Sequence, residues 1–88
     1  MRKKLSDLNV FERRKLGEGM QLMAKREIIG DKGKKIFTKD KIYPIVSKCG
    51  ADAIRLKDDC GHEQLMFVGM LVIKREDWVN DFHLLTED

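Results

Sequence analysis

Apolar residues near the start of the chain recur at intervals of three and four residues, which is the spacing of one face of an α-helix. Ser6 can cap such a helix at its N-terminus, whereas Gly17 and Gly19 would each weaken it by about 1 kcal/mol relative to alanine. The pattern therefore predicts a helix over residues 5–15, followed by a turn or a weaker helix. The apolar residues concerned are Leu5, Leu8, Phe11, Leu16, Met20 and Met23.

From Glu27 onward the period shortens, and short apolar runs alternate with turns that are rich in Gly, Asp and Lys. Ile54 and Leu56 alternate with charged residues, as in a strand that buries one face. The segment Asp58–Gly61 has the composition of a tight hairpin turn. We expect strands over residues 42–46, 53–57, 62–73 and 81–85, and one helical turn over residues 74–80.

The stretch from Leu65 to Ile73 is the longest apolar run, and it is too short to cross a membrane as a helix. Gly69 is expected to bend it. A continuous apolar run predicts a strand covered on both faces, here by a barrel interior and by the N-terminal helix. The pattern as a whole predicts a mainly β domain at residues 27–88, a small antiparallel barrel of about five strands, preceded by a basic helical extension at residues 1–26.

The composition is that of one small domain with a heavily charged surface. The chain has 88 residues, of which 42% are hydrophobic and 38% are charged, against about 25% charged in an average domain. Its charged start lacks the apolar core of a secretory signal, and two cysteines are too few for a disulfide scaffold. We therefore expect a cytoplasmic protein with no membrane association. Translation from Met20 or Met23 instead of Met1 would give a shorter form that keeps the predicted β domain.

The charge is concentrated in the first half of the chain. Residues 1–48 hold 14 lysines and arginines and 6 acidic residues, a net +8, whereas residues 49–88 hold 4 and 9, a net −5. A basic face attracts nucleic acid, acidic protein surfaces or anionic lipid, although solubility alone also explains it. Because lysine dominates, any nucleic-acid binding is expected to be weak, salt-sensitive and independent of sequence. The basic patch expected in two adjacent turns comprises Lys32, Lys34, Lys35, Lys39 and Lys41.

Residues with catalytic or metal-binding chemistry are present, but their spacing does not form a known site. Cys49 and Cys60 are expected at opposite ends of one strand, so they should form neither a disulfide nor half of a zinc site with His62 and His83. Two carboxylates at the predicted hairpin tip are explained by hydrogen bonds within the turn. No nucleophile elbow, phosphate-binding loop or dinucleotide fingerprint occurs. We expect no enzymatic activity, no metal and no cofactor.

Three segments resemble small SH3-like barrel proteins encoded by bacteriophages. They are residues 33–45, with a Gly-Lys-Lys opening and the Ile42–Ile45 strand, residues 54–63, with Asp-Asp-Cys-Gly, and the aromatic pair Trp78 and Phe82. The similarity covers about residues 33–85 and rests on turn and core positions. It implies an SH3-like barrel, and it implies a small phage protein that acts by binding in the cytoplasm of its bacterial host.

These observations predict a non-enzymatic binding module that binds and modulates or inhibits a host protein. The alternative is a weak, sequence-independent DNA- or RNA-binding protein that uses the basic patch. A protein partner would be held by apolar or basic anchors, although Trp78 has core packing as its other expected role. The candidate anchors are Phe11, Arg13, Arg14, Met70 and Trp78.

Overall fold

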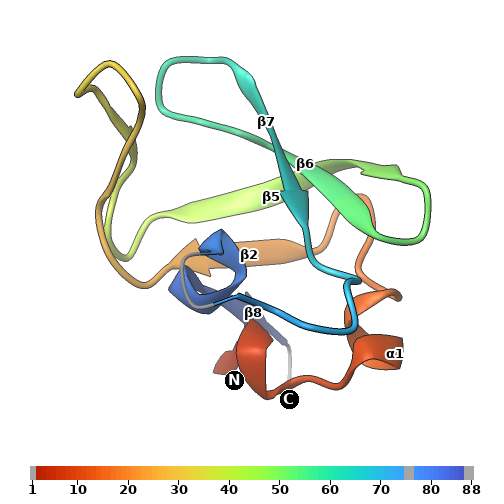
Figure 1. Cartoon of the computed structure of the whole chain (residues 1–88). Coiled ribbons are helices and arrows are strands. Elements are labelled where there is room, and N and C mark those ends of the chain that lie inside the picture. Colours follow the sequence, from red (N-terminus) through yellow and green to blue (C-terminus); the bar gives the residue numbers. More distant parts are fainter. Residues whose placement is uncertain (1, 75–76, 87–88) are drawn as a thin grey trace.

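A computed structural model describes residues 2–74 and 77–86 of the protein (Figure 1). The fold is mainly β and antiparallel, as predicted, with a six-stranded sheet in the order β1-β8-β2-β5-β6-β7 and a small β3-β4 sheet. The strands are β1 (Arg2–Lys4), β2 (Gln21–Ala24), β3 (Ile28–Ile29), β4 (Lys35–Phe37), β5 (Ile42–Cys49), β6 (Ala53–Lys57), β7 (Glu63–Phe67) and β8 (Phe82–Leu85). The helical elements are η1 (Leu5–Asp7), α1 (Val10–Arg13) and η2 (Trp78–Asp81).

The N-terminal segment does not form the predicted helix over residues 5–15. It forms a short strand, a 3-10 turn and the single turn of α1, and Leu5, Leu8 and Leu16 reach the core from this irregular path. These three leucines, which belong to the apolar residues spaced by three and four positions, are thus buried, although no continuous helix carries them. Strand β2, which lies before residue 27, pairs with both β5 and β8. The main sheet therefore includes residues on both sides of the expected boundary between the extension and the β domain.

Strands β5, β6 and β7 form a meander close to the one predicted. Ile54 and Leu56 are buried whereas Arg55 and Lys57 are exposed, which follows the alternation of the sequence. The turn between β6 and β7 contains Gly61 with a φ of 83°, a conformation that glycine adopts without strain. These three strands form the half of the six-stranded sheet that follows β2 in the strand order.

Aromatic rings join the two sheets in the core. The ring of Phe37, on β4, meets the rings of Tyr43, Trp78 and Phe82 edge to face, at centroid distances of 4.8, 5.7 and 5.2 Å. This arrangement suits the ring quadrupoles and fixes the β3–β4 hairpin against β5, β8 and η2. Phe37 and Phe82 are fully buried, as expected of the few large side chains that this short chain has.

The apolar run after β7 differs from its prediction. β7 ends at Phe67, and Met70, Leu71 and Val72 are exposed in a loop instead of forming a strand covered on both faces. Of the helical turn expected over residues 74–80, η2 contains the last part, and residues 75 and 76 lie outside the described residues. β8 confirms the expected closing strand. Within residues 2–74 and 77–86, no helix has the length and apolar character needed to span a bilayer.

Candidate protein-interaction surface

Three consecutive apolar side chains are exposed just after β7, and we call Met70–Val72 the apolar loop. Leu71 and Val72 are each 77% exposed, and Met70 is 46% exposed. Scattered exposed apolar residues are ordinary on protein surfaces, but a run of three on one loop is a feature of interaction sites.

Two arginines fix the backbone at the base of the apolar loop. Arg13, only 5% exposed, donates from Nε to the Val68 carbonyl at 2.7 Å and from Nη2 to the Met70 carbonyl at 2.7 Å. Its Nη1 also donates to the Leu8 carbonyl. Arg14 donates from Nε to the Gly69 carbonyl at 3.0 Å. The guanidinium of Arg13 thus has three carbonyl partners, which replace the water it loses on burial.

The single helical turn α1 places these arginines. Asn9 caps it in both directions: its side chain accepts from the Glu12 amide at 2.8 Å, and the Glu12 carboxylate accepts from the Asn9 amide at 3.0 Å. This capping box stabilises a helix too short to persist by itself. Arg13 follows directly, so the local cap determines where its side chain enters the core.

Gly69 lets the loop approach the rest of the protein closely. A Cβ atom at this position would lie 2.7 Å from the Ala51 carbonyl oxygen, 2.9 Å from Arg14 Cγ and 2.9 Å from Asp52 Cα. Two of these contacts are with backbone, which cannot move aside cheaply. The amides of Val68 and Gly69 both donate to the Asp52 carbonyl at 2.9 Å. The bend expected at Gly69 is therefore a point of tight packing.

The predicted anchors occupy different environments. Phe11, on α1, is 70% exposed, and Met70 belongs to the apolar loop. Trp78 is half-buried and packs against the core through Phe37. Arg13 and Arg14 bond to main-chain carbonyls of their own chain, and the carbonyls at the base of the apolar loop lie about 55 residues away, so no local signal marks this role.

The basic patch is divided by ion pairs. Lys35 lies 3.7 Å from a carboxylate oxygen of Glu27, and Lys41 lies 2.8 Å from a carboxylate oxygen of Asp59. The other three are exposed, and within the described residues none of them is in an ion pair: Lys32, Lys34 and Lys39. The patch consequently presents less free charge than the sequence suggests.

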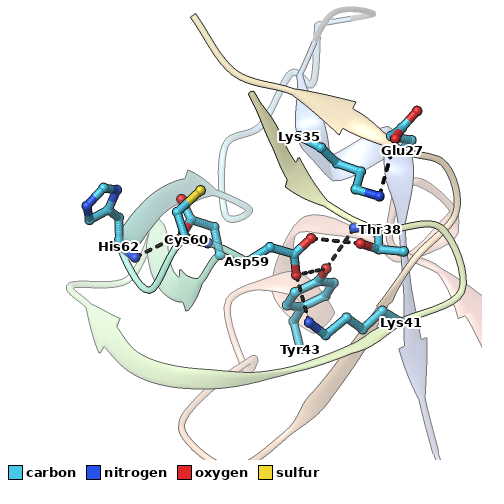
Figure 2. A network of polar contacts seen from close by, with 9 residues as sticks. Glu27, Lys35, Thr38, Lys41, Tyr43, Asp59, Cys60 and His62 are labelled. Atoms are coloured by element: carbon cyan, nitrogen blue, oxygen red, sulfur yellow. Dashed lines mark hydrogen bonds and ion pairs between the residues drawn. The ribbon is translucent and has the colours of Figure 1, made fainter. Parts of the chain in front are cut away.

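Asp59 joins the β6–β7 turn to the segment between β4 and β5 (Figure 2). Its carboxylate accepts from Thr38 Oγ1 at 2.7 Å, from Lys41 Nζ at 2.8 Å and from the Tyr43 hydroxyl at 2.8 Å. Burial raises the pKa of Asp59, but these three donors outweigh it and hold the pKa below its usual value. Burial also raises the pKa of the Tyr43 hydroxyl.

The neighbouring carboxylate of Asp58 organises the hairpin turn itself. It accepts from the amides of Cys60 and His62, each at 2.9 Å, and from Gln64 Nε2 at 2.8 Å. Burial raises its pKa, and these donors outweigh that effect to lower it. The turn therefore uses both carboxylates structurally, as the sequence pattern indicated.

The four potential metal ligands do not come together at one place: Cys60 and His62 share the turn after β6, and the other two lie elsewhere in the sheet. Both cysteines are free thiols: Cys49 ends β5 and Cys60 lies in the turn after β6. His83, on β8, is in another part of the sheet, and among the described residues neither of its ring nitrogens has a hydrogen-bond partner. Within the described parts of the chain, no group of three or more His, Cys, Asp or Glu side chains could hold a metal ion.

Comparisons of the chain with protein-family models, curated protein sequences and solved structures find no significant match. The geometry of the surface is therefore the main basis for proposing a function.

Proposed function

We propose that this protein is a non-enzymatic binding module that attaches to another protein through the apolar loop. The observation that carries this proposal is the exposure of Leu71 and Val72 directly after a backbone segment, residues 68–70, whose carbonyls bond to Arg13 and Arg14. Burial of one such side chain stabilises a complex by about 1.5–3 kcal/mol. A loop that is already ordered also loses little conformational entropy when a partner binds.

The strand order supports an SH3-like arrangement as part of this proposal. The order β8-β2-β5-β6-β7, the long β3–β4 hairpin between β2 and β5, and the 3-10 turn before β8 all agree with the similarity seen in the sequence. Such folds often present loops and hairpin turns to a partner, while the sheet supplies a rigid base.

The kind of partner is proposed from the same resemblance. A small phage protein of this fold acts on a host protein, in the host cytoplasm, and modulates or inhibits it. An apolar loop fits a protein surface with a shallow apolar pocket better than it fits nucleic acid, whose backbone carries a charge at each phosphate.

Nucleic-acid binding is the second candidate, and the lysines outside the ion pairs favour it. Lys32, Lys34 and Lys39 lie in two turns that the fold holds near the β6–β7 turn. Three point charges would bind a phosphate backbone weakly, with a shallow salt dependence.

The test is affinity capture from bacterial lysate with the full chain and a loop variant that carries Met70→Ser, Leu71→Ser and Val72→Ser. We expect the parent to retain one stoichiometric protein after nuclease treatment, and the loop variant to lose it. The matched control is Ile29→Ser with Ile42→Ser, since both isoleucines are exposed apolar residues away from the loop.

The outcomes separate the two candidates. A partner lost equally from the loop variant and the isoleucine control would contradict the loop proposal. Capture that disappears with nuclease, or with Lys32→Gln, Lys34→Gln and Lys39→Gln, would favour nucleic acid. Circular dichroism of each variant checks that the sheet is intact.

A further inference from the structure

Strand β7 is an open edge of the main sheet, because within residues 2–74 and 77–86 β6 is its only strand partner. The hydrogen bonds at the two ends of the β6–β7 pair show which residues of β7 direct their backbone groups toward β6. The Asp58 amide donates to the His62 carbonyl at 2.8 Å, and the Val68 amide donates to the Asp52 carbonyl at 2.9 Å. In an antiparallel ladder the bonded pairs alternate, so residues 64 and 66 face β6.

The remaining residues of β7 direct their backbone groups away from β6. They are Glu63, Leu65 and Phe67, which oppose Lys57, Arg55 and Ala53 as non-bonded pairs. Within the described residues, no backbone hydrogen bond occupies these outward groups. Unpaired backbone groups in register along an edge are a template for another strand.

The side chains of this edge also suit a second strand. Leu65 is 45% exposed and Phe67 is 54% exposed, on the same face of the sheet. A groove of about 240 Å³ between β7 and η2, lined in part by Trp78, leaves space beside the strand. β7 also lacks lysine, proline and a bulge, the features with which sheet edges usually avoid pairing.

We propose that β7 pairs with β7 of a second copy of this chain. An antiparallel arrangement with a two-fold axis at Leu65 places the outward residues of one copy opposite those of the other. Glu63 then opposes Phe67 of the second copy, Gln64 opposes Met66, and Leu65 opposes Leu65. No like charges face one another, and each outward pair exchanges two backbone hydrogen bonds.

The pairing is independent of the apolar loop, so it goes beyond the proposed function. It joins two six-stranded sheets into one, and it leaves both apolar loops available. A contact of five residues per copy buries less than the roughly 1,200 Å² of a standard interface, so the dimer is weak and depends on concentration.

The test measures self-association of the full chain by sedimentation and amide exchange by NMR. As concentration rises toward roughly millimolar, the apparent mass should approach twice 10.3 kDa. Exchange of the Glu63, Leu65 and Phe67 amides should slow by roughly tenfold, whereas the Gln64 and Met66 amides stay protected throughout.

Leu65→Pro and Leu65→Ala form a matched pair of variants, since both lose the leucine side chain but only proline removes the outward N–H. That N–H faces away from β6, a position where an edge strand tolerates proline. Leu65→Pro should abolish association, and Leu65→Ala should only weaken it. If Leu65→Pro does not fold, Leu65→Lys takes its place and should also give a monomer. A parent that stays monomeric, a folded Leu65→Pro that associates like Leu65→Ala, or association lost in the Met70–Val72 serine variant would overturn the proposal.

Discussion

The two edge strands of the main sheet differ in how readily another strand could pair with them. β1 consists of Arg2, Lys3 and Lys4, all exposed, so a second strand would have to desolvate three like charges to pair with it. β7 has the sequence Glu-Gln-Leu-Met-Phe and exposes leucine and phenylalanine. One edge of this sheet is therefore charged and the other is largely apolar, and this difference supports the proposal that β7 is the edge that accepts another strand.

The edges also differ in how they are held. In the part of the chain that the structure describes, β1 pairs with β8 alone, whereas β7 is held at both ends by contacts in addition to its pairing with β6. The Asp59 network secures the turn before β7, and Arg13 and Arg14 secure the segment after it. The open edge is therefore preorganised, and the protected edge depends mainly on its neighbour.

The largest expected effect is from Arg13→Met, which breaks the anchor after β7. Three carbonyls lose their donor, so the free energy of unfolding should fall by about 3 kcal/mol or more, measured by urea denaturation. Amide exchange should accelerate at Met66 and Val68 more than at Leu84, beside β1. Arg14→Met is the matched control, because this arginine is half-exposed and should cost about 1 kcal/mol. Equal losses would show that burial of Arg13 does not hold β7.

Asp59→Asn should weaken the anchor before β7 by about 1 kcal/mol, since the carboxylate accepts three hydrogen bonds. The pKa of Asp59 is lowered in the folded protein. Its contribution is therefore complete above the usual carboxyl pKa of about 4 and is lost as the pH falls through the lower folded value. Urea denaturation from pH 6 to acid pH should show a smaller decline for Asp59→Asn than for the parent. Asp31→Asn, which removes an exposed carboxylate outside this network, is the control for the loss of one negative charge.

Removing the charge from β1 should make this edge associate as well, with little change in the free energy of unfolding. Removing the charge of β1 with Arg2→Gln, Lys3→Leu and Lys4→Gln should cause concentration-dependent association, measured by sedimentation. Surface changes of this kind alter the free energy of unfolding by only about 0.5 kcal/mol each. Combining them with Leu65→Lys shows whether the new association uses β1. If the β1 variant associates no more than the parent, the basic residues do not protect that edge.

The smallest expected effect concerns His83, which lies opposite Lys4 in the pairing of β8 with β1. Burial lowers the pKa of His83, and the charges of Lys25, Arg2 and Lys4 lower it further. The unfolded chain then binds more protons near pH 6, so stability should be complete above the usual pKa of about 6.5 and decline as the pH falls below it. Thermal unfolding at several pH values measures this slope. The uncharged β1 variant should reduce it, and His83→Phe should remove the contribution of this residue.

The sequence predicted the meander because alternation carries the information there. Arg55 and Lys57 separate two buried residues of β6, and Asp58 and Gly61 have the chemistry of the turn that follows. The prediction failed at β2, whose Leu22, Met23 and Ala24 are all buried. A strand covered on both faces has no period of two, and Met23 of this strand also continues the three-and-four spacing that indicates a helix.

The candidate surface was predicted only in part, for a different reason. Phe11 and Met70 were expected as anchors and are exposed, but the apolar loop was assigned to a covered strand. Whether an apolar run is buried depends on which other segments pack against it. The local sequence pattern does not contain that information. Arg13 was expected to face a partner, and instead it bonds the main chain at Val68 and Met70, contacts that only the tertiary fold creates.

The pairing of β1 with β8 has a mechanical consequence. Arg2 and Leu85 are partners in this pair, so the first and the last strand along the chain lie side by side. A tensile load applied to both ends would open the pair as a zipper, one rung after another from Arg2 and Leu85. A load applied between Arg2 and the apolar loop would instead act on several strands together. The protein should therefore yield at low force when pulled by its ends, while the edge that binds remains folded longest.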